Sequence, residues 1–206
     1  MALNYPLTLP ASPTFSRMVF HANSAVGLSA SPFTFAQQVY ENQGEMWEAD
    51  VELPPMQRAD AEAWIGFLLG LNGRRGTFFM GDPVGTSPRG TWGGGSPVVN
   101  GNQSAGVKTV SIRGVDGLTW KAGDWFQLGS GSATRLHRIV QDGSQVGSPQ
   151  VGDLEIWPRT RAALSDGQAL TLSSAKGIWR LSDNKRSWSM EIAQVYGIAF
   201  SAMEAL

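Results

Sequence analysis

The chain has 206 residues, of which 42% are hydrophobic, and its eight Trp and nine Phe supply enough apolar material for a folded core. Charged residues make up only 16%, below the roughly 25% usual in soluble domains, and the net charge is −1. This balance argues against a general nucleic-acid-binding surface, and the lack of cysteine excludes disulfides, thiolate metal sites and cysteine nucleophiles. The low charge indicates that partners cover part of the surface; the alternative is a monomer with a polar, uncharged surface.

The N-terminal sequence MALNYP has neither the basic region nor the apolar region of a signal peptide. No apolar run approaches the roughly 18 residues that a membrane span requires. We therefore expect a protein that stays in the cytoplasm where it is made, or travels in a particle assembled there, without binding a membrane.

The first clear element in chain order is a strand at 46–53, where apolar and acidic residues alternate. The apolar positions are Trp47, Ala49, Val51 and Leu53, and the acidic ones are Glu48, Asp50 and Glu52. Apolar parity at 18–20 and at 33–39 predicts two further strands, separated by turns near Asn23 and at 42–44.

The period then changes from two to that of a helix. Apolar residues at 61, 64, 65, 68 and 69 predict an amphipathic helix over 58–72, ended by Asn72 and Gly73. A short strand at 77–80 follows. These elements leave a sheet edge open, and a strand edge needs a partner.

That partner is expected from the end of the chain, where 188–200 keeps one apolar parity and predicts a single long strand with a bulge near Gln194 or Gly197. Residues 178–181 and the turn at 182–185 predict the first arm of a hairpin. Between these parts, short strands at 107–112, 125–128, 134–140, 154–157 and 169–172 are separated by glycine turns and show no helical period.

The predicted fold class is therefore mainly β, a β-rich α+β chain with one helix. We expect a discontinuous first domain, 1–82 and 175–206, interrupted by a small inserted β-barrel at 83–174. The glycine-rich stretch 81–96 between them allows three interpretations: a linker, a phosphate-binding loop or the entrance to the insertion. The phosphate-loop pattern is absent, and Gly93–Gly95 precede Ser-Pro-Val-Val rather than a helix, so we favour the entrance.

No set of residues carries an enzyme's signature, and we expect no catalytic residue, cofactor or metal. The two histidines, His21 and His137, lie in strand-like sequence, where a polar or interface role is the stronger expectation. The three acidic residues of 46–53 could hold a hard cation, but a solvated strand face is favoured. Arg159 and Arg161 are too few for nucleic-acid binding and are better explained as interface charges.

Two long segments carry a resemblance to a known family. QQVYENQGEMWEADVELPPMQRADAEAWIGFLLGLNGRRGTFFMGDP and the closing WRLSDNKRSWSMEIAQVYGIAFSAMEAL are similar to the distal tail proteins of long-tailed bacteriophages and of phage-like gene transfer agents. The shared features are the Trp-containing strand, the RADAEAW helix, the GTF strand with Gly-Asp-Pro, and the final Glu-Ala-Leu. The insertion, with AGDWFQLGSGSATRLHRIVQD and LEIWPRTR, resembles oligonucleotide/oligosaccharide-type barrels.

The resemblance implies a non-enzymatic structural protein of the virion, located at the tail tip. The first domain would be tail-tube-like and form a homo-hexameric ring that joins the tail tube protein to the baseplate hub. The tape measure protein and tail fibre would be neighbours, and DNA would only pass through. On this basis we expect Glu48, Asp50 and Glu52 to face the channel or a seam between subunits, since a channel for DNA should not grip phosphates.

Three alternatives remain open. In a carbohydrate-binding tail-tip adhesin, Trp92, Trp120 and Trp125 would cluster as exposed aromatics of the insertion and stack on sugars. A tail-tube or tube-terminator protein would instead stack into tubes or cap the other end of the tail. A hydrolase is the weakest alternative, because no acid, base and nucleophile set is recognisable.

Overall fold

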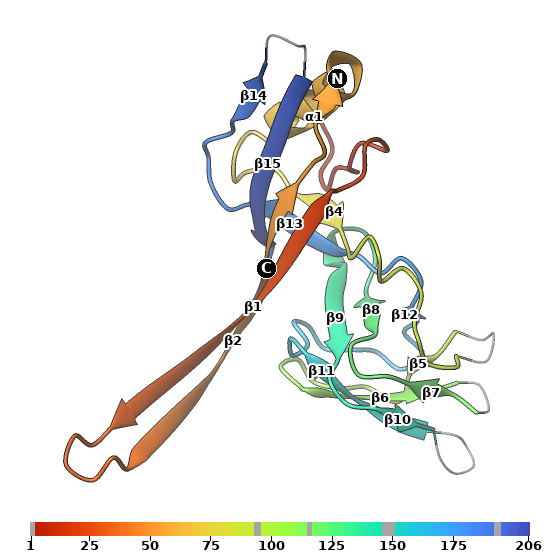
Figure 1. Ribbon diagram of the computed structural model, residues 1–206. Coiled ribbons are helices and arrows are strands. Elements are labelled where there is room, and N and C mark those ends of the chain that lie inside the picture. Colours follow the sequence, from red (N-terminus) through yellow and green to blue (C-terminus); the bar gives the residue numbers. More distant parts are fainter. Residues whose placement is uncertain (1–2, 93–95, 115–116, 146–150, 192–194) are drawn as a thin grey trace.

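The computed structural model describes residues 3–92, 96–114, 117–145, 151–191 and 195–206 (Figure 1). Within this part of the chain the protein is mainly β with one α-helix, so the predicted fold class is confirmed. Two sheets dominate, one seven-stranded and one six-stranded, and each has its own hydrophobic core. Gln194 and Gly93–Gly95, which the sequence analysis singled out, lie outside the described residues.

The seven-stranded sheet joins the two ends of the chain. Its strand order is β1 (Arg17–Ala30), β2 (Gln37–Glu52), β15 (Val195–Glu204), β13 (Gly177–Leu181) and β4 (Phe78–Met80), with β3 (Met56–Gln57) and β14 (Trp188–Met190) also paired to β15. All these pairs are antiparallel. Strand β15 therefore lies beside β2, as expected of the segment that closes the sheet.

Helix α1 (Arg58–Gly70) packs its apolar side on this sheet. Trp64 and Leu68 are buried in the same core as Val51 and Ile198, while Leu69 on the helix's outer side is half exposed. After the helix the backbone takes positive φ at Asn72 (50°) and Gly73 (68°), the conformation that ends a helix. The predicted helix and its termination are confirmed.

The six-stranded sheet forms a nearly closed barrel. Its order is β12 (Leu170–Thr171), β8 (Trp125–Leu128), β9 (Arg135–Ile139), β11 (Val151–Trp157), β6 (Thr109–Arg113) and β5 (Val98–Val99), with a short 3-10 helix at Gly131–Ala133. A separate two-stranded ladder joins β7 (Thr119–Trp120) to β10 (Gly143–Ser144). The amide of Val99 donates to the carbonyl of Gln168 at 2.8 Å, so the last strand approaches the first.

The five strands predicted in the middle of the chain are confirmed with small shifts of their ends. All of them lie in the six-stranded sheet, and the segments predicted for the first domain supply the seven-stranded one. Trp125 and Leu136 nevertheless pack in the core of the seven-stranded sheet. The domain boundaries at 82 and 175 stay a prediction.

Two predictions for the first sheet are wrong. The chain makes no turn at Asn23 or at 42–44; β1 and β2 form one long hairpin whose turn lies at 31–36, and a bulge near Ser24 absorbs the extra residues of β2. Residues 188–200 do not form one strand, because the chain reverses and β14 pairs with β15, placing Trp188 opposite Ile198. In both cases the alternation of apolar residues continues across the point where the chain reverses, so the alternation alone could not locate that point.

Candidate functional site

The most conspicuous surface feature is the outer part of the β1–β2 hairpin, residues 22–44, which we call the arm. Figure 1 shows it leaving the rest of the molecule as a two-stranded ribbon. Every residue from 21 to 44 is exposed except Ser31, which is half-buried. Because both faces of this ribbon meet solvent, its sequence cannot show the alternation of a half-buried strand.

The arm is uncharged from Ala22 to Tyr40 and carries many exposed apolar side chains. The 19 residues from Ala22 to Tyr40 contain no Asp, Glu, Lys or Arg. Half of the large hydrophobic side chains that are exposed in the described residues lie here: Val26, Leu28, Phe33, Phe35, Val39 and Tyr40. Phe33 and Phe35 at the turn are 92% and 81% exposed. An isolated hairpin is marginally stable in water, so this composition is that of a surface to be covered.

Strand β1 is in addition an edge of the seven-stranded sheet. In the described residues no strand pairs with its outer side, over 14 residues. At the opposite edge, β4 is covered by the N-terminal segment, since the amide of Leu7 donates to Thr77 at 2.8 Å and that of Phe79 donates to Leu7 at 2.9 Å. The fold thus covers one edge and leaves the other open.

The base of the arm is bonded to the barrel by charged groups. On β2, Glu45 is 5% exposed and accepts a hydrogen bond at 2.6 Å from the backbone amide of Arg159, whose side chain also contacts it. Glu41, four residues nearer the tip on the same strand, forms ion pairs with Lys108 and with Arg159. The hydrogen bond and charge of Lys108 hold the pKa of Glu41 below its usual value.

A second buried carboxylate completes this cluster. Glu204 near the end of β15 is 4% exposed and accepts from Arg161 Nη2 at 2.8 Å and from the backbone amide of Trp47 at 3.3 Å. The guanidinium of Arg161 also donates to the carbonyl of Glu45. Arg159 and Arg161 are therefore contact charges between the barrel and the sheet of one chain.

Aromatic side chains add to the contact between the sheet and the barrel. The Trp47 indole donates to the carbonyl of Leu136 at 3.1 Å, and its ring lies 4.2 Å from Trp157 and 5.0 Å from Trp125, centroid to centroid. His137 in β9 is buried and its Nδ1–H donates to the carbonyl of Pro158 at 2.8 Å. Burial lowers its pKa to about 4, so it is neutral at physiological pH. These contacts fix the direction of the arm relative to the barrel.

The three acidic residues of 46–53 lie on one face of the sheet, as their spacing predicted. Glu48 is half-buried, whereas Asp50 and Glu52 are exposed. Register places His21 opposite Glu48 and Arg17 opposite Glu52, so bases share this face with the acids. Whether it faces a channel or a seam between subunits stays a prediction.

Asp50 lies between a histidine and a serine. His21 Nε2 is 3.0 Å from its carboxylate, and Ser201 Oγ donates to the other oxygen. The hydrogen bonds from Ser201 and then His21 lower the pKa of Asp50. In a serine hydrolase the histidine stands between serine and acid; here the acid occupies the middle, so this trio cannot relay a proton from Ser201 to His21.

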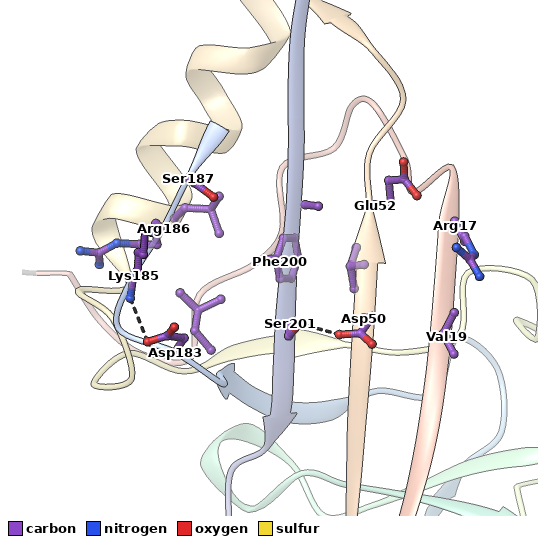
Figure 2. A pocket seen from close by; sticks show the side chains of 14 residues that line it. Arg17, Val19, Asp50, Glu52, Asp183, Lys185, Arg186, Ser187, Phe200 and Ser201 are labelled. Atoms are coloured by element: carbon purple, nitrogen blue, oxygen red, sulfur yellow. Dashed lines mark hydrogen bonds between the residues drawn. The ribbon is translucent and has the colours of Figure 1, made fainter. Parts of the chain in front are cut away.

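Two of the grooves beside this sheet, each of about 390 Å³, differ in chemistry. The first is charged and contains Asp50, Glu52, Arg17, Lys185 and Arg186 (Figure 2). Figure 2 shows the turn with Asp183 and Lys185 standing across from β15, where Phe200 and Ser201 are labelled. Basic and acidic side chains are mixed around this groove, so its electrostatic potential is not of a single sign.

The second groove, which we call the N-terminal groove, is mostly apolar. Its walls include Pro10, Pro13 and Phe15 from the N-terminal segment, Trp64 from α1 and Met80 from β4. Trp64 is 1% exposed, and its indole Nε1 is buried without a hydrogen-bond partner. Asp82 stands at the rim; burial raises its pKa, but amides of Gly85 and Val84 and the Trp125 indole outweigh this, and the pKa is lowered.

The predicted cluster of exposed tryptophans is wrong. Trp92, Trp120 and Trp125 are 7%, 2% and 4% exposed. Trp92 and Trp120 belong to the barrel core, 6.4 Å apart, and Trp125 packs with Trp47 under the sheet. A small barrel must fill its interior, and it does so with these side chains.

In the described ranges no group of three or more His, Asp or Glu side chains is arranged to hold a metal ion. Nor do these ranges contain a helix of the length and apolarity that a bilayer crossing requires. No protein-family model matches the chain, and no curated protein matches it either. The arm, with its charged base and the open edge of β1, is therefore the candidate functional surface on structural grounds alone.

Proposed function

We propose that the chain is a structural subunit of a phage-type tail, a distal tail protein. In this proposal its copies form a hexameric ring that connects the tail tube to the baseplate hub at the tail tip and leaves a channel for DNA. The discontinuous sheet domain forms the ring, and the inserted barrel decorates it. The number six comes from the family resemblance.

The observation that carries the proposal is the exposed part of the arm from Ala22 to Tyr40, which is uncharged. Six large apolar side chains stand in solvent on a ribbon that the rest of the chain does not cover. Such a surface is typical of proteins whose structure is completed by assembly. The open outer edge of β1 supports the same conclusion, since edges are paired or protected in proteins that stay monomeric.

The charged base indicates that the arm is held at a fixed position against the barrel. Buried Glu45 and Glu204 each accept two hydrogen bonds: Glu45 from Arg159 and Arg161 of the barrel, and Glu204 from Arg161 and the backbone amide of Trp47. An arm held at a set angle can meet the same surface on every neighbouring copy, which a closed ring requires. The 16% charged composition leaves room for large uncharged contacts between copies.

The competing interpretations are separated by particular observations. Exposed tryptophans in the insertion would have favoured the adhesin alternative, and Trp92, Trp120 and Trp125 are buried. A tail-tube protein would give stacked rings, and a tube terminator would bind the tube end away from the hub.

The solution mass with negative-stain images of the same fraction tests the proposal. Six copies of 22.1 kDa give 132.6 kDa, so we expect a ring near this mass with a central hole, alone or after addition of tube or hub protein. A particle of another symmetry, a stacked tube, or a monomer that binds neither tube nor hub would contradict it.

A further inference from the structure

We propose that the arm tip of one copy inserts Phe33 and Phe35 into the N-terminal groove of a second copy of the same chain. This inference rests on the proposed function, because it names the surface through which the ring closes. The two parts are complementary in chemistry: the tip is aromatic and uncharged, and the groove is lined mostly by apolar side chains, with Asp82 and Lys176 as its charged members.

The other groove is a poor match for the tip. It has the same volume of about 390 Å³, but its walls carry Asp50, Glu52, Asp183, Lys185 and Arg186. Placing phenyl rings there would desolvate charged groups without giving them partners. The N-terminal groove is therefore a better fit for an apolar tip than the charged groove is.

The arm cannot fill its own groove. Phe15 in the groove wall precedes the first residue of β1, and Phe33 follows the last one, so the 14 residues of this strand separate them by about 45 Å. Figure 1 shows the arm leaving on one side and the red N-terminal segment lying on the other. A contact between unlike surfaces on two copies propagates from copy to copy and produces a ring when the rotation closes.

The area involved suits a stable contact. The exposed parts of Phe33 and Phe35 amount to roughly 300 Å², and the other four apolar side chains of the arm bring the total to the order of 600 Å². A standard interface buries about 800 Å² on each partner. In a ring each copy gives one arm and receives one, so its buried area is about twice that of a single contact.

The absence of cysteine from the chain allows a clean cross-linking test. Thr34 at the tip and Thr14 at the groove are both exposed, so the double variant Thr34→Cys/Thr14→Cys should fold normally. Because the two positions are too far apart to link within one chain, every disulfide between them joins two copies. We expect oxidation to give a ladder of covalent oligomers ending at the ring. The matched control is Thr34→Cys/Ser187→Cys, with the second cysteine on the charged groove, and we expect it to stop at tip-to-tip dimers.

The mass of the unmodified protein, measured alongside, separates the two proposals. Rings without the Thr34–Thr14 link, or with an equal ladder in the Ser187 control, would overturn the tip-in-groove contact and leave the ring intact. A protein that forms no oligomer, even with tube or hub protein present, would overturn both. As a second readout, Phe33→Ser/Phe35→Ser should abolish oligomers without changing the unfolding curve of the monomer, whereas Met190→Ser, another exposed apolar position, should leave oligomers unchanged.

Discussion

The backbone amide of Arg159 donates to the carboxylate of Glu45 at 2.6 Å, so the barrel is bonded directly to the strand that becomes the arm. The two residues are 114 positions apart in the chain. Both side chains are shielded from solvent, with 13% exposure for Arg159 and 4% for Glu45. The direction of the arm therefore depends on this contact with the barrel as well as on the hairpin itself.

Removing the Glu45 carboxylate should therefore destabilise the protein strongly. Glu45→Ala removes the buried partner of Arg159 and Lys108 and leaves them only the exposed Glu41, and loss of one member of a buried ion pair costs about 3–5 kcal/mol. Urea denaturation should show this loss in the free energy of unfolding. The control is Glu62→Ala on α1, whose pair with Arg58 is exposed, with an expected cost below about 1 kcal/mol. Equal effects of the two substitutions would show that the base of the arm contributes no more than a surface pair.

Stability should also fall as the pH drops from about 6.5 to about 4, because His137 is buried. Its pKa is lowered to about 4 in the folded protein, so in this window the unfolded chain binds the proton and the folded one does not. The stabilisation is fully present above the unfolded pKa of about 6.5 and decreases by at most about 3 kcal/mol on acidification.

Urea midpoints between pH 7 and pH 4 would measure this effect, with His137→Asn as the comparison. Asn keeps a donor for the carbonyl of Pro158 but does not titrate, so the variant's free energy of unfolding should depend less on pH. The pKa of the Asp166 carboxyl is lowered to about 2, chiefly by its hydrogen bond to Arg113. Its protonation changes the free energy of unfolding only below the unfolded pKa of 3.8, so it does not contribute to the pH dependence expected from His137. Parallel curves for both proteins would contradict the assignment.

The sequence predicted those elements that have one buried and one exposed face. The helix and the strand at 46–53 each pack on a single core, so their apolar residues follow the period of the backbone. The arm escaped this reasoning because both of its faces are exposed, and Phe33 with Phe35 suggested a strand where the chain turns. The base of the arm could not be predicted from the sequence, because Glu45 and its partners come from segments that are far apart in the chain. The close spacing of Arg159 and Arg161 was the sequence feature that pointed to a contact there.

The packing of Trp120 inside the barrel depends on two glycines that lie against its ring. At Gly152 an added Cβ would lie 2.4 Å from the Trp120 ring, and at Gly143 2.5 Å from the same ring. The ring therefore occupies the space that two missing side chains leave. Sequence reasoning assigned glycine to turns, and so had no ground for placing Trp120 in the core.

A pair of glycine substitutions tests this packing. Gly152→Ala should cost several kcal/mol, because the added methyl group must displace the rigid ring of Trp120 in a filled core. Gly66→Ala, in the exposed middle of α1 with no atom within 4 Å of its added Cβ, should raise stability by about 0.5–1 kcal/mol. Thermal unfolding of both variants measures the difference in sign. A neutral Gly152→Ala would mean that Trp120 moves freely in the barrel.

The acidic face of β2 offers a direct test of the channel hypothesis. Glu48→Lys, Asp50→Lys and Glu52→Lys together change the charge of one subunit by six units. If this face lines the channel, rings should still form but should bind DNA in a salt-dependent manner, because lysines attract phosphates that the acids repel. If it lies at a seam between subunits, the added like charges should prevent ring formation.

The matched control carries the same change of charge elsewhere, in Asp60→Lys, Glu62→Lys and Glu191→Lys, all at exposed positions. Mass measurements and DNA retention at low and high salt distinguish the two locations. Rings that form normally and bind no more DNA than the control would place Glu48, Asp50 and Glu52 on the outer surface.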